Sequence, residues 1–276
     1  PDAYGHLPNA NTVFDSTGWA LEDQISLTMM MDYAADLAGQ VNVPADGSVL
    51  ETACGTGAVT RHVVPRLPDN ASFVATDLAS PMVEITQNVI GDAPNVEVRQ
   101  ADAMDLPFDD GAFDAMACQF SLMLMPDKPK ALAEAARVLR PGGSFLFNVW
   151  DRLEENGFSA AVHEAVGEVF PNDPPRFLQV PYAWHDLTAT VRETQGAGFQ
   201  DIEIAVQPRV SRADGARQVA TGLVAGSPLA GEVADRGSPS LDDTVEAVTQ
   251  KLEARFGTGP ITAPMQAFRL TATLAA

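Results

Sequence analysis

The sequence predicts an α/β protein built on a doubly wound, mostly parallel sheet, and three observations support this fold class. Short apolar runs alternate with helical patterns over residues 49–150. The first of these runs leads through Glu51 into a turn that contains Gly55 and Gly57. The second run ends at Asp77, twenty residues after Gly57. Such an alternation is typical of a parallel sheet with helices on both faces.

The elements follow from apolar periodicity and from the residues that interrupt it. We expect strands at residues 49–54, 72–76, 96–100, 113–119, 144–150, 202–207 and 265–274. We expect helices at residues 22–39, 58–67, 80–90, 127–140, 158–170, 187–195, 211–225 and 240–256. A proline-rich loop is expected at residues 171–181, and a loop rich in Gly, Ser and Pro at residues 226–239.

Several helix boundaries have their own chemical signals. Pro65 interrupts the helical pattern that begins at residue 58, so that helix is predicted to be short. Ser80 is expected to cap the helix that carries Pro81 in its first turn, and Asp127 to begin the helix that ends at Gly142-Gly143. Asp186 is expected to cap the helix at residues 187–195.

Composition indicates one large domain and argues against polyanionic partners. The chain has 276 residues, of which 46% are hydrophobic and 20% charged, enough to bury a sizeable core. Its 37 acidic and 17 basic residues give a net charge of −20. This charge opposes phosphate backbones and anionic membrane surfaces, so we expect neither nucleic-acid nor membrane partners. A small or neutral substrate fits better, and the acidity itself is explained by a well-solvated surface.

The cysteines and the apolar runs indicate a cytoplasmic protein. Only Cys54 and Cys118 are present, which does not support a secreted disulfide framework. No run of eighteen apolar residues occurs, and the N-terminal residues lack the basic-then-apolar pattern of a signal peptide.

The turn at Gly55 and Gly57 has the features of a nucleoside-cofactor site. Glycine takes positive φ without strain and lets the backbone approach a ligand closely. The helix that follows directs its free N–H groups toward the same place. Asp77 stands where a ribose-binding carboxylate is expected in a doubly wound fold, and Asp102 follows the next predicted strand.

Five motifs in order carry a resemblance to a known family. They are Glu51 to Gly57, Asp77-Leu78, Ala101 to Phe108, Phe113-Asp114 and Arg137 to Gly143. Over about residues 45–150 the chain resembles the class I S-adenosylmethionine (SAM)-dependent methyltransferases of the small-molecule type, similar to those of ubiquinone and menaquinone biosynthesis. The resemblance implies a Rossmann-like sheet of seven strands with an antiparallel last strand, and SAM as the cofactor.

The resemblance also implies how a single domain of residues 1–276 is organised. Residues 1–21 would form an N-terminal cap, although an arm docked by its aromatic side chains is an equal alternative. Residues 45–150 would form the SAM-binding core and residues 151–198 a helical insertion on the substrate side. Residues 199–276 would supply the C-terminal strands and helices.

The amino-acid end of SAM is expected near the first and fourth strands. The resemblance implies that Glu51 accepts a hydrogen bond from the cofactor's ammonium, directly or through water. The backbone around Ala53, Gly55 and Gly57 would approach the same end of the cofactor. Gln119, at the end of the fourth strand, would lie near its methionine portion.

The adenosine end is expected over the second and third strands. Asp77 would accept hydrogen bonds from both ribose hydroxyls, because a carboxylate can accept more than one. Leu78 and Met82 would enclose the adenine, with Asp102 accepting from its amine and the Ala103 N–H facing a ring nitrogen. Each assignment has a simpler alternative, since Asp77 can cap a turn, Asp102 can serve ordinary turn chemistry and Met82 can belong to the core.

The chemistry expected is in-line methyl transfer to a small molecule, with an oxygen, nitrogen or carbon acceptor left open. No catalytic base is assigned. His185 is a weak candidate that more simply begins the following helix. Scattered histidines and the absence of paired-cysteine spacing predict no metal site.

Two alternative functions stay open at this stage, as does the oligomeric state. The first is an NAD-dependent oxidoreductase. Two observations argue against it: Thr60 stands where a dinucleotide-binding turn prefers a small residue such as a third glycine, and Asp102 is an additional acid. The second is a SAM-binding protein without turnover.

Overall fold

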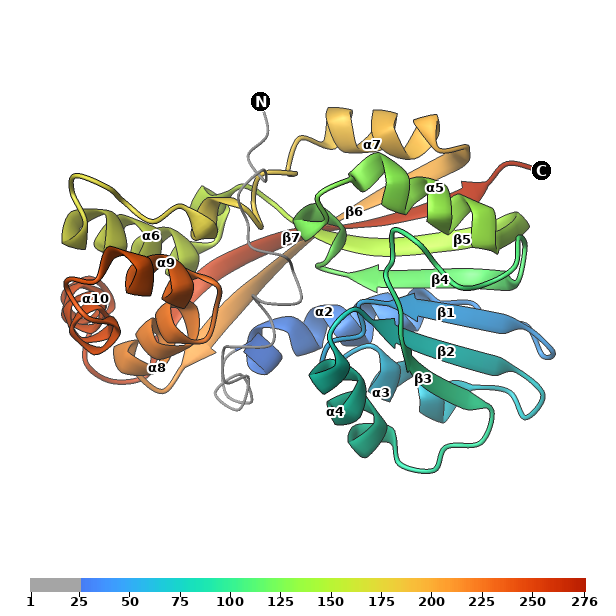
Figure 1. Ribbon diagram of the computed structural model, residues 1–276, viewed down its shortest axis with the longest axis horizontal. Helices are drawn as coiled ribbons and strands as arrows, with labels where there is room; N and C mark the ends of the chain where they lie inside the picture. Colours follow the sequence, from blue (N-terminus) through green and yellow to red (C-terminus); the bar gives the residue numbers. More distant parts are fainter. Residues whose placement is uncertain (1–25) are drawn as a thin grey trace. The chain divides into compact units, whose positions relative to one another are not determined.

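The computed structural model describes residues 26–276, and its contacts divide the chain into two compact units (Figure 1). Unit 1 contains the residues up to Met30, Trp150–Ala183 and Gln207–Ala267. Unit 2 contains Met31–Val149, Trp184–Val206 and Phe268–Ala276. The cap expected at residues 1–21 lies outside the described residues. The expectation that residues 1–276 form one methyltransferase domain, with the four segments given in the sequence analysis, stays a prediction.

The sheet confirms the predicted fold class. Its seven strands lie in the order β3-β2-β1-β4-β5-β7-β6, and β7 runs antiparallel to the other six (Figure 1). The strands are β1 (Ser48–Thr52), β2 (Ser72–Asp77), β3 (Val96–Gln100), β4 (Phe113–Gln119), β5 (Leu139–Trp150), β6 (Phe199–Ala213) and β7 (Ile261–Leu274). Because β1 lies between β2 and β4, the strand order reverses beside β1. In open α/β sheets, ligands bind at the carboxyl ends of the strands at such a point.

Helices cover both faces of the sheet in unit 2. On one face, α2 (Ser26–Gln40) and the short α3 (Thr60–Val63) share a core with β1, β2, β4 and β5, in which Leu37 and Val63 pack with Val49 and Leu146. On the other face lie α5 (Lys128–Val138) and α7 (Leu187–Gly196) (Figure 1). This double cover explains why successive residues of β1 and β4 are buried, rather than every second one.

Unit 1 has its own apolar core. It contains α6 (Gly157–Val169), α8 (Ala216–Ala220), α9 (Leu229–Arg236) and α10 (Leu241–Phe256), and a π-helical turn (Thr221–Ala225) follows α8. Side chains from these helices pack together with Ala213 and Ile261, which come from β6 and β7. The predicted insertion of residues 151–198 is thus divided between the units, because α6 belongs to unit 1 and α7 to unit 2.

Three predictions of element type or extent were wrong. The helix expected at residues 211–225 is replaced in its first part by β6, where Gln207, Ser211 and Ala213 are buried on one face as a strand requires. The loop expected at residues 226–239 contains α9, which buries Leu229 and Val233. The helix expected to end at Gly142-Gly143 ends at Val138, and both glycines belong to β5.

Those two glycines have a different structural purpose. Gly142 has a φ of +78°, a conformation that other residues rarely adopt. At Gly143, an added Cβ would lie 2.8 Å from the Arg140 carbonyl oxygen. The pair therefore permits a close backbone approach where the register between β4 and β5 shifts, between the pairs Phe113–Leu139 and Ala115–Ser144.

The helix caps give a mixed result. The predicted caps Asp127 and Asp186 each accept hydrogen bonds from backbone N–H groups at the start of their helices. Ser80 does not cap α4 (Ser80–Ile90), because the N-cap position belongs to Ala79, whose N–H donates to the Asp77 carboxylate.

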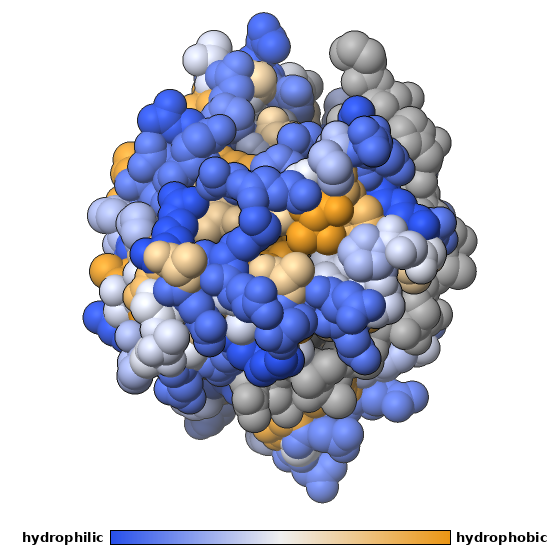
Figure 2. Space-filling view, turned by 90° about the vertical axis from the view of Figure 1, so that its left-hand side faces the viewer, coloured by the Kyte–Doolittle hydropathy of each residue, from blue (hydrophilic) through white to orange (hydrophobic). Residues whose placement is uncertain are grey.

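Within residues 26–276, no helix is both long enough and apolar enough to cross a membrane. Figure 2 shows a face that is mostly hydrophilic, with a limited group of apolar residues among the polar ones.

Candidate active site

The turn after β1 has the strained backbone that close approach to a ligand needs. Ala53, Gly55 and Gly57 all have positive φ, at 52°, 55° and 78°. Among the residues that the structure describes, an added Cβ at Gly55 would meet nothing within 4 Å beyond its chain neighbours, whereas at Gly57 it would lie 3.2 Å from the Thr86 hydroxyl. Gly57 therefore lies close to α4, and Gly55 faces open space beside the turn.

Glu51 lies beneath this turn as a buried carboxyl group. Its Oε2 accepts a 2.6 Å hydrogen bond from the Thr60 hydroxyl at the start of α3. Burial raises the pKa of the Glu51 carboxyl from 4.5 to about 8, the Thr60 hydrogen bond opposes the rise, and the charge of Asp77 adds to it. Thr60, which departs from a dinucleotide-binding pattern, therefore has a specific role as the donor to Glu51.

Asp77 joins the ends of β1 and β2. Its Oδ2 accepts from the Gly55 N–H at 2.9 Å, and its Oδ1 accepts from the Ala79 N–H at 2.9 Å. Burial raises the pKa of the Asp77 carboxyl, while the N–H groups of Ala79 and Gly55 oppose the rise. Asp77 therefore caps the turn, which was the simpler of its two expected roles. Its ribose-binding role stays a prediction.

The segment after β3 brings Asp102 and Ala103 to the same carboxyl edge of the sheet. Asp102 Oδ1 accepts from the Met104 N–H at 2.8 Å, and its carbonyl accepts from the Asp105 N–H at 3.0 Å. Both Asp102 and Ala103 are partly exposed. Asp102 therefore stabilises a local turn, which was the simpler of its two expected roles. The adenine contacts expected of Asp102 and Ala103 stay predictions.

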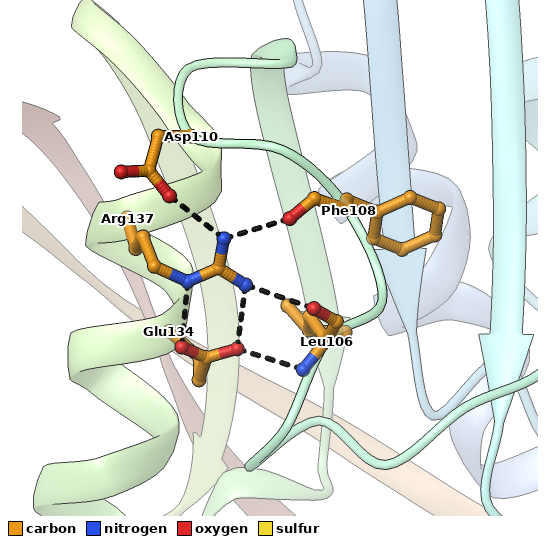
Figure 3. A network of polar contacts seen from close by, with 5 residues as sticks. All are labelled: Leu106, Phe108, Asp110, Glu134 and Arg137. Atoms are coloured by element: carbon orange, nitrogen blue, oxygen red, sulfur yellow. Dashed lines mark hydrogen bonds and ion pairs between the residues drawn. The ribbon is translucent and has the colours of Figure 1, made fainter.

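Two side chains of α5 hold the continuation of this loop (Figure 3). Arg137 donates to the carbonyl oxygens of Leu106 at 2.8 Å and Phe108 at 2.7 Å, and to the Asp110 carboxylate at 2.9 Å. Glu134 pairs with Arg137 and accepts from the Leu106 N–H at 2.7 Å. This set of contacts, which we call the Arg137 clamp, fixes the loop that follows Asp102.

The remaining predicted cofactor residues differ in exposure. Leu78 and Gln119 are partly exposed at the ends of β2 and β4. Met82 is only 3% exposed on α4, as expected of a core residue, and its adenine contact stays a prediction.

The register places four polar side chains on one face of the sheet, at the carboxyl ends of adjacent strands. Glu51 pairs with Ala117, which pairs with Leu146, so these three side chains share the face covered by α2 and α3. Side chains alternate along a strand, so Gln119 and Asn148, two residues further on, share that face. Asp77 follows Ala75, the partner of Glu51, by the same two residues. We call Asp77, Glu51, Gln119 and Asn148 the polar row.

Sequence reasoning missed Asn148, the fourth member of the polar row. The residue is fully buried on β5 and pairs with Gln119. A signal was available, because Asn148 is the only polar residue in the run Phe145 to Trp150. Asparagine is depleted from strands, so its presence in a buried strand needs a reason.

The structure also shows where the candidate base His185 lies and whether metal-binding side chains gather in the described residues. His185 is exposed and directly precedes Asp186, which caps α7. This position agrees with the simpler alternative, in which His185 only begins the helix. The described part of the chain contains no group of three or more His, Cys, Asp or Glu residues that could hold a metal ion.

The chain resembles known proteins in both sequence and structure. The family described as "Methyltransferase domain" matches residues 49–143. A ubiquinone/menaquinone biosynthesis C-methyltransferase, UbiE of Idiomarina loihiensis, is 37% identical over 184 residues, which cover 62% of this chain and 72% of that protein. The chain belongs to the class I SAM-dependent methyltransferases. The predicted resemblance is therefore confirmed.

Other comparisons set the extent of the likeness to this methyltransferase family. A demethylmenaquinone methyltransferase of Lactiplantibacillus plantarum is 31% identical over 143 residues, which cover 50% of this chain and 60% of that enzyme. The chain thus spans less than two thirds of the length of this curated relative. The crystal structure of YcgJ from Bacillus subtilis matches with a TM-score of 0.59 and 20% identity, covering 89% of this chain and 99% of that one, which supports the fold.

Proposed function

We propose that this protein transfers a methyl group from SAM to a small-molecule acceptor by in-line displacement. One observation carries the proposal within this family. The Gly55 amide and the Asp77 carboxylate meet at 2.9 Å where the strand order reverses, beside open space at Gly55. Backbone amides and a carboxylate at the carboxyl ends of β1 and β2 are the groups that a bound nucleoside requires.

The residues present fit SAM. The turn keeps positive φ at three positions, so its backbone can lie against a ligand. The carboxyl groups of Glu51 and Asp77 supply oxygen atoms that can accept hydrogen bonds from the ammonium and the ribose hydroxyls of the cofactor, and a cation bound beside Glu51 would oppose the rise that burial causes in its pKa. We assign Glu51, Ala53, Gly55, Gly57 and Gln119 to its amino-acid end. We assign Asp77, Leu78, Met82, Asp102 and Ala103 to its adenosine end.

The chain's catalytic contribution is positioning. SAM supplies an activated methyl group when bound, so the protein has to align the acceptor behind that group and exclude water. We assign no general base, since His185 is exposed. The acceptor is proposed to be a small, neutral molecule, because a protein with a net charge of −20 repels polyanions.

We also propose a reducing, cytoplasmic location. Both cysteines, Cys54 and Cys118, are buried free thiols. Burial raises the pKa of both thiols, which disfavours the reactive thiolate.

The experiment that tests the function is calorimetry followed by a turnover assay. S-adenosylhomocysteine (SAH) and NAD are each titrated into the full chain, and we expect binding of SAH alone. SAM is then incubated with a panel of acceptors that includes reduced demethylmenaquinone, and methylated product is measured by mass spectrometry. Binding of NAD in place of SAH would favour the oxidoreductase alternative, whereas SAH binding without any product would favour a binding protein.

A pair of glycine variants gives the control. Gly55→Ala adds a side chain in the open space of the turn at a φ of +55°, so we expect SAH affinity to fall. Gly167→Ala adds the same methyl group within α6, where it would meet no described residue from outside the helix within 4 Å, and should leave SAH affinity unchanged. Equal affinities in the two variants would contradict the placement of SAM at this turn.

A further inference from the structure

The Asn148 carboxamide is a buried polar group that lacks a partner. Its side chain is fully buried, and neither Oδ1 nor Nδ2 has a hydrogen-bond partner among the residues that the structure describes. Its backbone is paired normally, since its carbonyl oxygen accepts from the Phe120 N–H at 3.2 Å. Buried amides are nearly always hydrogen-bonded, because an unpaired one loses its interactions with water without compensation. This side chain therefore needs a partner that residues 26–276 do not supply.

Its place in the polar row indicates which partner. Asp77, Glu51 and Gln119 lie on β2, β1 and β4, the strands to which we assign SAM. Asn148 lies on β5, the next strand on the far side of β4 from β1, and pairs directly with Gln119. With SAM assigned as proposed above, a molecule beyond its amino-acid end would meet Asn148, and we place the methyl acceptor on that side.

The chemistry of the side chain limits the acceptor. A carboxamide has two N–H donors and one carbonyl acceptor and carries no charge. It therefore suits a neutral hydroxyl or carbonyl group better than an ion. Its neighbours along the same face of β5, Leu146 and Trp150, are apolar, so a single polar group on an otherwise apolar molecule is the best complement.

We propose that the Asn148 carboxamide binds a neutral hydroxyl or carbonyl group of the methyl acceptor, which rests on the proposed function. Phe120, next to Gln119, has a φ of +51° and packs edge-on against Tyr33 at 5.3 Å between ring centroids. Because the Asn148 side chain is fully buried, the acceptor reaches its amide only when residues that cover the amide move aside.

A matched pair of probes tests the proposal without knowledge of the natural acceptor. 1-Naphthol and naphthalene differ only by one neutral hydroxyl group, and their binding to the SAH-saturated protein is measured by ligand-observed NMR. The wild type should bind 1-naphthol more tightly by about fivefold, the ratio that one net hydrogen bond gives. Asn148→Leu should lose this preference and keep the SAH affinity of the wild type.

Thermal unfolding supplies a second readout. Asn148→Leu replaces an unpaired amide with an apolar side chain of similar size, so its melting temperature should rise. Thr249→Val, a buried polar-to-apolar change in α10, is the control and should leave the preference for 1-naphthol intact.

The outcomes separate this proposal from the proposed function. A wild type that does not bind SAH would contradict the proposed function. A wild type that binds SAH but does not prefer 1-naphthol, or an Asn148→Leu variant that keeps the preference, would overturn the role of Asn148. Loss of SAH affinity in Asn148→Leu would overturn it as well, because the amide would then serve the cofactor.

Discussion

Asp77 has the hydrogen-bonding capacity for two tasks, a turn cap and the proposed contact with the ribose. Each of its carboxylate oxygens already accepts one backbone N–H, from Gly55 and from Ala79. A carboxylate oxygen has two lone pairs, so each can accept a second hydrogen bond from a ligand hydroxyl. The turn contacts therefore orient the carboxylate without using all of its capacity.

We predict that Asp77→Ala weakens SAH binding by about 1.5–3 kcal/mol, the range for hydrogen bonds to a charged group. The cause is the loss of the carboxylate and of its hold on the Gly55 amide. Calorimetry measures the effect, and Asp109→Ala, which removes an exposed acid, is the control. Unchanged SAH affinity in a folded Asp77→Ala variant would show that Asp77 serves the turn alone.

Glu51 makes stability depend on pH. Burial raises the pKa of its carboxyl from 4.5 to about 8, so between these pH values the folded protein binds more protons than the unfolded chain. The contribution of Glu51 to the free energy of unfolding therefore falls as pH rises from about 4.5 to about 8 and is constant above that range.

We predict that Glu51→Gln removes this dependence while it keeps the size of the side chain. Urea unfolding from pH 5 to pH 9 should show a wild type that loses stability relative to the variant as pH rises. Glu84→Gln, at an exposed position of α4, should follow the wild type. Parallel curves for wild type and Glu51→Gln would show that the Glu51 carboxyl does not titrate in this range.

The site could be predicted from sequence where a residue type has one main use at its position. Gly55 and Gly57 are of this kind, since both were expected to take positive φ in the turn after β1 and both do so. Asn148 could not be assigned, because its lack of a partner depends on every residue that packs around it. Thr60 was read as a departure from a motif, and only the fold reveals that its hydroxyl donates to Glu51.

At the scale of elements, the Arg137 clamp links α5 to the loop after β3. The guanidinium donates to two loop carbonyl oxygens and to two carboxylates, as its planar fork of donors allows (Figure 3). The side chain of Glu134 is only 16% exposed, so part of this network is shielded from water.

We predict that Arg137→Lys lowers the free energy of unfolding by about 1–2 kcal/mol, because lysine keeps the charge and loses the fork. Amide hydrogen exchange should become faster in the loop that ends at Asp110. Arg152→Lys alters an exposed ion pair with Glu155 and should have a smaller effect. Equal losses in the two variants would contradict the special role of the clamp.

Helices and strands could be predicted where the sequence itself marks their ends, and could not be predicted where packing decides their extent. The bounds of α4, β3 and β4 were predicted as observed, because apolar runs and breakers coincide at their ends. In α9 the central Gly231 and the nearby Ser and Pro residues hid an apolar face formed by Leu229 and Val233. β6 extends beyond its predicted end because its burial is set by packing in unit 1 rather than by local composition.

At the scale of the whole molecule, charge is the dominant surface property. The chain has 37 acidic and 17 basic residues, and the face in Figure 2 is mostly hydrophilic. Ion pairs such as Arg255–Glu164 join helices within unit 1, yet the basic residues are too few to neutralise the acidic ones. Repulsion among carboxylates therefore opposes folding.

We predict that added salt stabilises the protein. Raising NaCl from about 0.02 M to about 0.3 M shortens the screening length and weakens this repulsion, so the melting temperature should increase. Differential scanning calorimetry at pH 7 measures the shift, and a neutral osmolyte at matched osmolality serves as the control. A lower melting temperature in salt would mean that the ion pairs outweigh the repulsion.

The polar row has a consequence for laboratory evolution. Its members come from separate strands, so exchanging the side chain at Asn148 alters one end of the row and leaves Glu51 and Asp77 in their own strands. Libraries limited to the tip of β5 should therefore yield catalysts with new substrate preferences that still recognise the same methyl donor.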